Sequence, residues 1–242
     1  MPTPPEVLAG LLRSDPGRPR ITCYDDTDGP TRGERIELSA KVLANWVSKA
    51  ANALQDEWDL GPGARVRLDL PAHWRTVYWA LAAWSVGATV VLPEADDTGT
   101  HTSPPDLLVT DAPVAAQEAA SPSVLVTLAA LARTAGVPLG GDTMDEAREL
   151  STYGDQFAAY DEPAPGDPAL VWAGGTTSYD EVVPHGAAAG TRVHLTDPST
   201  SRLLRSALGA WAVDGSVVLT RGAPTAEVLV ARRAAEGVTA EG

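Results

Sequence analysis

Residues 63–92 read GARVRLDLPAHWRTVYWALAAWSVGATVVL, and residues 190–219 read GTRVHLTDPSTSRLLRSALGAWAVDGSVVL. Aligned without a gap, the two stretches are identical at 14 of 30 positions. Each has the pattern of a buried strand, a proline, a helix with one apolar face and a second buried strand, which is a βαβ unit of a parallel sheet. A solenoid needs more repeats. The two copies therefore predict an α/β protein with two related, mostly parallel sheets and flanking helices.

The residues before the first copy predict two helices and a hairpin. Residues 5–15 are typical of a short amphipathic helix. Residues 20–24 and 35–37 read as strands on either side of an Asp-, Gly- and Pro-rich turn, which predicts a β-hairpin. Ser39 is a good helix N-cap, and the apolar residues that follow it recur at helical spacing. We expect this second helix to pack on a sheet.

The residues between the copies are less regular. Residues 94–106 are polar and predict a loop, 107–110 predict a buried strand, and 124–135 mix strand and helix signals. Residues 140–168 are rich in Gly, Asp and Pro and predict a surface connection with one helical turn near 144–150. We divide the chain into residues 1–165, with the hairpin and the first repeat at 63–92, and residues 166–242, with the second repeat at 190–219.

Charge and cysteine content limit the classes of partner. The chain has 32 acidic and 18 basic residues, a formal net charge of −14, and no long basic cluster. Nucleic acid and anionic membranes are therefore poor partners. Cys23 is the single cysteine, so no intramolecular disulfide can form, and the N-terminus does not have the charged start and apolar centre expected of a signal peptide. We expect a cytoplasmic protein. The preference for arginine over lysine indicates a bacterial genome rich in G and C.

The common signatures of catalytic and metal sites are missing. The four histidines, at positions 73, 101, 185 and 194, are scattered without the spacing of a metal site. The sequence has no G-x-S-x-G elbow, no G-x-G-x-x-G turn and no Walker loop. We predict no catalytic residue and no bound metal.

The order of these patterns resembles the N-terminal region of the adenylate-forming enzymes, which include acyl-CoA synthetases, luciferases and the adenylation domains of peptide synthetases. The resemblance covers about residues 5–238. It rests on the helix after Ser39, Leu-Gly-x-Gly at 60–63, the first βαβ unit, Asp-Leu-Leu-Val-Thr-Asp at 106–111, Asp-Pro-Ala-Leu at 167–170 with the Gly-Thr-Thr turn after it, the second βαβ unit, and Pro-Thr-Ala-Glu-Val-Leu at 224–229. It implies a fold with two subdomains of this kind.

The resemblance also implies a phosphate-binding loop, and the loop is degenerate. The family pattern is roughly Tyr-Thr-Ser-Gly-Thr-Thr-Gly-x-Pro-Lys-Gly, whose backbone N–H groups, hydroxyls and lysine contact the phosphates of ATP. Glu181 stands where the family has that lysine, and a carboxylate there repels phosphate by several kcal/mol. Five residues correspond to this loop and are predicted to form a vestigial phosphate site: Gly174, Gly175, Thr176, Thr177 and Ser178.

Three functions follow from this comparison. The family's magnesium, ribose and C-terminal lysine motifs are expected beyond Gly242, and no lysine follows Lys49. The first hypothesis is therefore a non-catalytic relative, without cofactor, that binds a small molecule or a protein partner. The second is an acyl-adenylate-forming enzyme that uses ATP, AMP and Mg²⁺ and is completed in trans by another polypeptide. The third is a scaffold that forms a homodimer.

Overall fold

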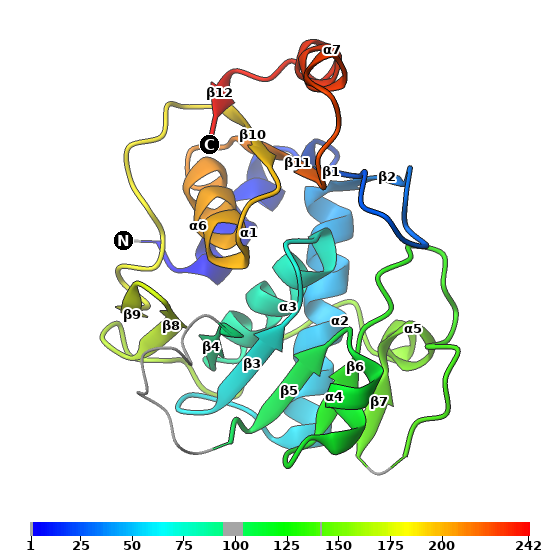
Figure 1. Cartoon of the computed structure of the whole chain (residues 1–242). Coiled ribbons are helices and arrows are strands. Elements are labelled where there is room, and N and C mark those ends of the chain that lie inside the picture. The colour runs from blue at the N-terminus through cyan, green and yellow to red at the C-terminus, as the bar shows by residue number, and fades with distance from the viewer. Residues whose placement is uncertain (1, 94–103, 141) are drawn as a thin grey trace.

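Two sheets and the helices between and around them make up this computed structural model, which describes residues 2–93, 104–140 and 142–242 (Figure 1). Most of the predicted loop at 94–106, with His101, therefore lies outside the described residues. The helices are α1 (Pro4–Ser14), α2 (Ala40–Trp58), α3 (Trp74–Ser85), α4 (Pro113–Glu118), α5 (Glu146–Glu149), the 3₁₀ turn η2 (Leu150–Thr152), α6 (Thr200–Trp211) and α7 (Ala226–Glu236). The strands are β1 (Pro19–Asp25), β2 (Arg35–Ser39), β3 (Arg65–Asp69), β4 (Thr89–Val91), β5 (Leu107–Thr110), β6 (Ser123–Leu125), β7 (Thr143–Asp145), β8 (Pro168–Trp172), β9 (Gly175–Ser178), β10 (Arg192–Thr196), β11 (Ser216–Arg221) and β12 (Ala240–Glu241).

The sheets are related and mostly parallel, as predicted. One has seven strands in the order β7-β6-β5-β3-β4-β8-β9, and the other has five in the order β12-β10-β11-β1-β2. All neighbouring strands pair in parallel except β9 with β8 and β2 with β1. The two predicted βαβ units are β3-α3-β4 and β10-α6-β11, and each pair of strands is parallel.

Local sequence signals account for the helix boundaries. The Ser39 side chain accepts a hydrogen bond from the Val42 N–H, so α2 begins where its N-cap predicts. Ser199 caps α6 in the same way, by accepting from the Arg202 N–H. The helix predicted at 5–15 is α1, which has Pro4 in its first turn and a capping box between Thr3 and Glu6.

Each hairpin pairs with the repeat from the other part of the chain and not with the repeat that follows it in the sequence. The first hairpin, β1-β2, pairs through β1 with β11 of the second repeat, while β8 of the second hairpin pairs with β4 of the first repeat. The sheets therefore do not divide the chain at residues 165 and 166, because each repeat has an open parallel edge that is closed by the hairpin from the other part of the chain. The register shifts at the same place in both hairpins, after Pro19 in one and after Pro168 in the other.

The core lies around α3, which contacts β3 and β4 of one sheet and β1 of the other. Every residue from Trp74 to Trp84 is buried. Trp84 donates its indole N–H to the Ala169 carbonyl in β8 at 2.7 Å, and Trp211, its counterpart in the second repeat, donates to the Arg20 carbonyl in β1 at 2.9 Å. The matched tryptophans therefore hold the exchanged hairpins to the repeats.

Part of the connection over 140–168 is more deeply buried than predicted. The helical turn near 144–150 is present as α5, but strand β7 precedes it, and Glu146 and Leu150 are buried. The prediction of a surface connection is wrong for these residues, because a strand of three residues is too short to show a period. In the ambiguous stretch 124–135, β6 ends at Leu125. No helix of the described residues is long and apolar enough to cross a membrane.

Candidate functional site

The five residues of the predicted phosphate loop lie in the β8-β9 hairpin. Trp172 pairs with Gly175, which leaves Ala173 and Gly174 as a two-residue turn, and the following Gly175–Ser178 form an edge strand. Gly175 has a φ of +107°, a backbone conformation that favours glycine. A Cβ on Gly174 would clash with the indole of Trp172, so packing on that ring accounts for this glycine without any phosphate.

Two carboxylates lie within hydrogen-bond distance of the hydroxyl at the end of this hairpin. The Ser178 hydroxyl donates to Oδ1 of Asp180 at 2.6 Å and lies 3.2 Å from Oε2 of Glu181. Two negative charges at this point oppose the approach of a phosphate. None of the five predicted residues lines any of four large cavities among the described residues. Whether the hairpin contacts a nucleotide stays a prediction.

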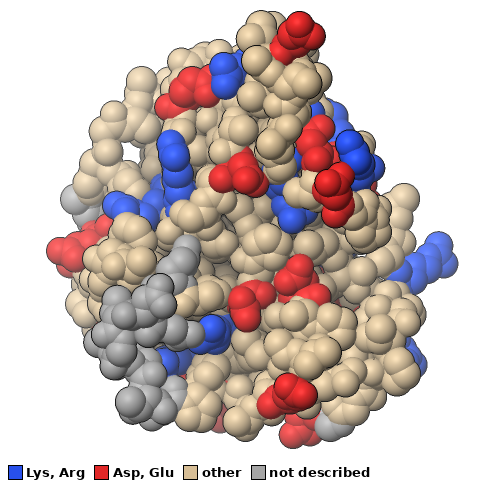
Figure 2. Space-filling model, viewed as in Figure 1, with Lys and Arg blue, Asp and Glu red and all other residues tan. Residues whose placement is uncertain are grey.

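A cavity that the motif search missed lies at the carboxyl ends of strands from both sheets. It measures about 340 Å³ and is lined by residues 27–31 after β1, Asp111 after β5, residues 125–129 at the end of β6, and Arg221 at the end of β11. Figure 2 shows acidic side chains in the middle of the same face, over the carboxyl ends of β3 and β5. In open parallel sheets, ligands bind at these strand ends. We call this cavity the inter-sheet cleft.

The arginine side chain that lines the inter-sheet cleft is neutralised by a carboxylate of the protein itself. The Arg221 guanidinium forms a buried ion pair with Asp25, which also accepts a hydrogen bond from the Thr27 N–H at 2.9 Å. Burial opposes the ionisation of Asp25, but hydrogen bonds from Thr27 and Thr31 and the charge of Arg221 outweigh it and lower the pKa of the carboxyl. Both partners are therefore charged at neutral pH, and their net charge is zero.

Two further titratable groups belong to this region: Asp111, which lines the cleft, and His73, which lies near Arg221 but does not line it. His73 is buried, and its Nδ1 accepts the Arg75 N–H at 3.3 Å as the N-cap of α3. Burial, together with the positive charges of Arg221 and Arg75, lowers the pKa of His73 well below its usual value, so the ring is neutral at pH 7. Burial raises the pKa of Asp111. The site can bind and orient a polar molecule through its hydroxyls, carboxylates and backbone groups.

The single thiol near the cleft is not a nucleophile at neutral pH. Cys23 is buried in β1, and burial raises the pKa of its thiol to about 12. The thiolate, which is the reactive form, is therefore scarce at pH 7. Among the described residues, no group of three His, Cys, Asp or Glu side chains is placed to hold a metal ion.

Sequence comparison places the chain in a family whose description names no activity. A Mycobacterium tuberculosis (strain ATCC 25618 / H37Rv) protein described as "TIGR03089 family protein" is 35% identical over 238 residues, which cover 93% of this chain and 91% of that protein. This chain belongs to the TIGR03089 family. No family model matches it.

Comparison with solved structures shows the fold of this chain. It is similar to a Brucella canis acyl-CoA synthetase, with 17% identity and a TM-score of 0.71 over 97% of this chain and 46% of that one. It is also similar to the N-terminal subdomain of Klebsiella oxytoca NpsA in complex with 3-hydroxyanthranilyl-AMSN, with 16% identity and a TM-score of 0.67 over 100% of this chain and 60% of that one. A Mycobacterium tuberculosis fatty acyl CoA synthetase has 14% identity and a TM-score of 0.70 over 100% of this chain and 49% of that one. The resemblance to the N-terminal part of adenylate-forming enzymes is confirmed as a fold, and the chain spans about half of the two synthetases.

Proposed function

We propose that this chain is a non-catalytic relative of the N-terminal region of adenylate-forming enzymes and acts in the cytoplasm as a small-molecule binding module. The inter-sheet cleft is the site of binding. One observation carries the proposal: Arg221 is the single basic residue among the described residues that line the cleft, and Asp25 already neutralises it. A triphosphate would therefore find no free positive charge there.

The charges around the cleft favour an uncharged or cationic ligand. Asp28 and Asp111 line the cleft beside Arg221, and Asp28 itself pairs with Arg32 at 2.8 Å. A ligand with hydrogen-bond donors would be met by these carboxylates and by the hydroxyls of Thr27 and Thr31. The same charges repel ATP, as do Asp180 and Glu181 at the hairpin. The proposal thus accounts for both places where a nucleotide would be expected.

A pyrophosphate-exchange assay with a panel of carboxylic acids tests the proposal directly. The chain as it stands is incubated with Mg-ATP, labelled pyrophosphate and each acid, and a full-length acyl-CoA synthetase serves as the positive control. We expect no exchange above background and, in calorimetry with millimolar Mg-ATP, no saturable heat. Clear exchange by this chain would overturn the proposal and favour the acyl-adenylate-forming enzyme. Heat without exchange would favour a subunit that another polypeptide completes.

A further inference from the structure

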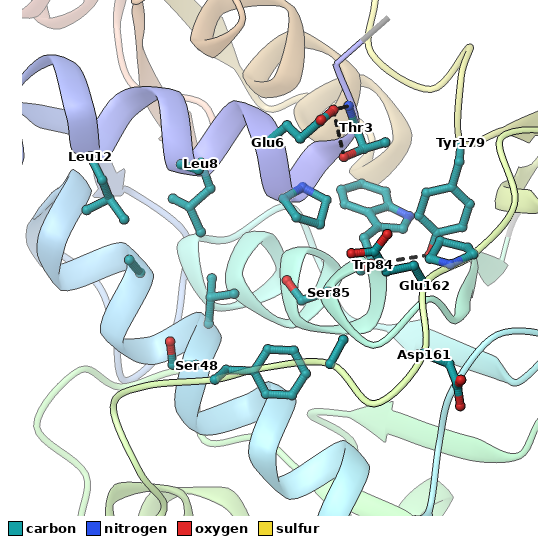
Figure 3. A pocket seen from close by; sticks show the side chains of 17 residues that line it. Thr3, Glu6, Leu8, Leu12, Ser48, Trp84, Ser85, Asp161, Glu162 and Tyr179 are labelled. Carbon is teal, nitrogen blue, oxygen red and sulfur yellow. Dashed lines mark hydrogen bonds between the residues drawn. The ribbon is translucent and has the colours of Figure 1, made fainter.

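A second cavity, which the proposed function does not use, lies where α1, α2 and α3 meet the segment 157–163 (Figure 3). It measures about 420 Å³, within the usual range for a small-molecule site. Trp84 and Ser85, at the end of α3, line it, and the chain turns from there into the start of β4. It therefore opens near the amino end of β4, whereas the inter-sheet cleft lies at strand carboxyl ends. We call it the helix groove.

Small side chains leave the helix groove open between the helices. Ala9 of α1 and Ala44 and Ser48 of α2 line it, and none of them is large enough to fill the space between the helices. Leu8 and Val47, which are almost completely buried, form apolar walls with the half-buried ring of Phe157. An aliphatic chain or a single ring that enters this space would be removed from water on several sides.

Three polar side chains of the walls form their hydrogen bonds away from the groove. The Trp84 indole donates to Ala169 at 2.7 Å, the Tyr179 hydroxyl donates to the Ala88 carbonyl at 2.8 Å, and the Ser85 hydroxyl donates to the Leu81 carbonyl at 2.8 Å. These groups have no need of a ligand. What they present to the groove is mainly apolar surface.

The charge at the mouth of the groove has one sign. Glu6, Asp161 and Glu162 line it, and no lysine, arginine or histidine does so among the described residues. Glu6 accepts hydrogen bonds from the N–H and the hydroxyl of Thr3, at 2.7 and 3.2 Å, which hold it in the capping box of α1. Figure 3 shows the Glu162 carboxylate directed into the space between Trp84 and Ser85, while Asp161 points away. Within the part of the chain that the structure describes, Asp161 and Glu162 form no ion pair.

We propose that the helix groove binds a small cationic amphiphile, a primary ammonium on an aliphatic chain or a single aromatic ring. The apolar part lies between Leu8, Val47 and Phe157, and the ammonium lies against the Glu162 carboxylate, with Glu6 adding negative potential. Charge complementarity selects this occupant, because a fatty acid of the same size would place its carboxylate beside two others. The groove is thus a cation-accepting site, distinct from the cleft of the proposed function.

Calorimetry with n-hexylamine at pH 7 and low salt tests the site, with hexanoate and hexanol as probes of the same length but different charge. We expect a saturable heat with the amine, a weaker one with the alcohol and none with the acid. The affinity for the amine should fall as salt is added, since the pair is partly exposed. Equal affinity for amine and alcohol, or no saturable heat with the amine, would overturn the proposal.

Two matched carboxylate variants locate the ammonium. Glu162→Gln keeps the shape of the side chain and removes its charge, and we expect it to weaken hexylamine binding about fivefold. Asp161→Asn removes the neighbouring charge, which points away from the groove, and should change binding by less than about twofold. Equal effects of the two changes would contradict the placement of the ammonium at Glu162.

A filling variant tests the apolar part. Ala44→Leu places a larger side chain in the groove and should abolish the heat of hexylamine binding while the thermal unfolding midpoint stays close to that of the parent. If this variant fails to fold, Ser48→Leu serves the same purpose one helical turn further along α2. Unchanged binding in a folded filling variant would overturn the proposal. Because the substituted residues line the helix groove and none lines the inter-sheet cleft, failure of these tests leaves the proposed function intact.

Discussion

The two βαβ repeats have closely similar sequences and very different surroundings. In the first, α3 lies between the sheets and every residue from Trp74 to Trp84 is buried. In the second, α6 covers one sheet and keeps Arg202 and Arg205 exposed. The conserved pattern of the repeat therefore specifies a strand, a helix and a strand, but the position of the helix in the molecule determines which of its side chains meet water.

One matched pair of arginines shows this difference most clearly. Arg75 of α3 is buried, donates to Oε1 of Glu146 at 2.7 Å and to the Ala129 carbonyl at 3.2 Å, and stacks on Trp74. Arg202, at the same position of the second repeat, is exposed. The same residue type is therefore a core ion-pair partner in one copy and a surface residue in the other.

The largest effect we expect is from breaking that buried pair. Arg75→Ala leaves the Glu146 carboxylate buried without its ion-pair partner, with only the Tyr78 hydroxyl still donating to it, and should lower the free energy of unfolding by about 3–5 kcal/mol. Arg202→Ala is the matched control and should change it by less than about 0.5 kcal/mol. Urea unfolding followed by tryptophan fluorescence measures both. Similar losses in the two variants would show that the repeats do not differ as described.

Substitution of either matched tryptophan should lower stability by a similar amount, because each donates its indole N–H to an exchanged hairpin. Trp84→Phe and Trp211→Phe each remove an indole N–H that holds an exchanged hairpin, and each should cost about 2 kcal/mol. Trp79→Phe is the control, since the Trp79 indole nitrogen has no hydrogen-bond partner among the described residues. It should cost less by about 1 kcal/mol, the value of one hydrogen bond. Equal costs for all three in thermal unfolding would contradict this.

The N-caps of the two repeat helices predict a difference in pH dependence. His73 caps α3, and its lowered pKa means that the unfolded chain takes up a proton at a higher pH than the folded one. Stability from this group is present above a pH of about 6.5 and is lost as pH falls below it, by up to about 1.4 kcal/mol per pH unit. His73→Asn keeps an acceptor at the N-cap and should remove this part of the slope. Ser199, the N-cap of α6, does not titrate.

Urea unfolding at pH 7.5 and 5.5 measures that slope. His194, whose pKa burial also lowers, leaves a residual slope in the variant. A slope that is identical in the parent and in His73→Asn would contradict the assignment to the N-cap of α3.

The smallest effect concerns the two hairpins. The β1-β2 hairpin has a long connection over residues 26–34, while β8-β9 turns in two residues with Asp180 and Glu181 beside Ser178. Glu181→Lys introduces the charge that the resemblance to adenylate-forming enzymes predicts at this position, but it does not open the hairpin, and Asp180 remains. We expect no saturable heat with millimolar Mg-ATP in calorimetry. A measurable affinity would show that charge alone separates this hairpin from a working phosphate loop.

The sequence predicted the elements well and their partners poorly. Helical spacing and caps indicated α1, α2, α3 and α6, and the repeat indicated two parallel βαβ units. The exchange of hairpins was missed because strand pairing such as Ile21 with Val217 joins residues that no local pattern connects. The inter-sheet cleft was missed for the same reason. Asp25 and Arg221 are far apart in sequence and meet only when β1 and β11 pair.

By itself, the sequence determined the local structures, because side-chain periodicity and capping residues act over a few residues. It also determined that the Gly-Thr-Thr segment is followed by the negative charge of Glu181 where a lysine would be expected. Only the tertiary structure decided that this segment is a tight edge hairpin, that Arg75 is buried while Arg202 is exposed, and that two cavities lie at different places around the sheets. Those properties depend on which distant segments pack together, and packing is set by the whole chain rather than by any one stretch of it.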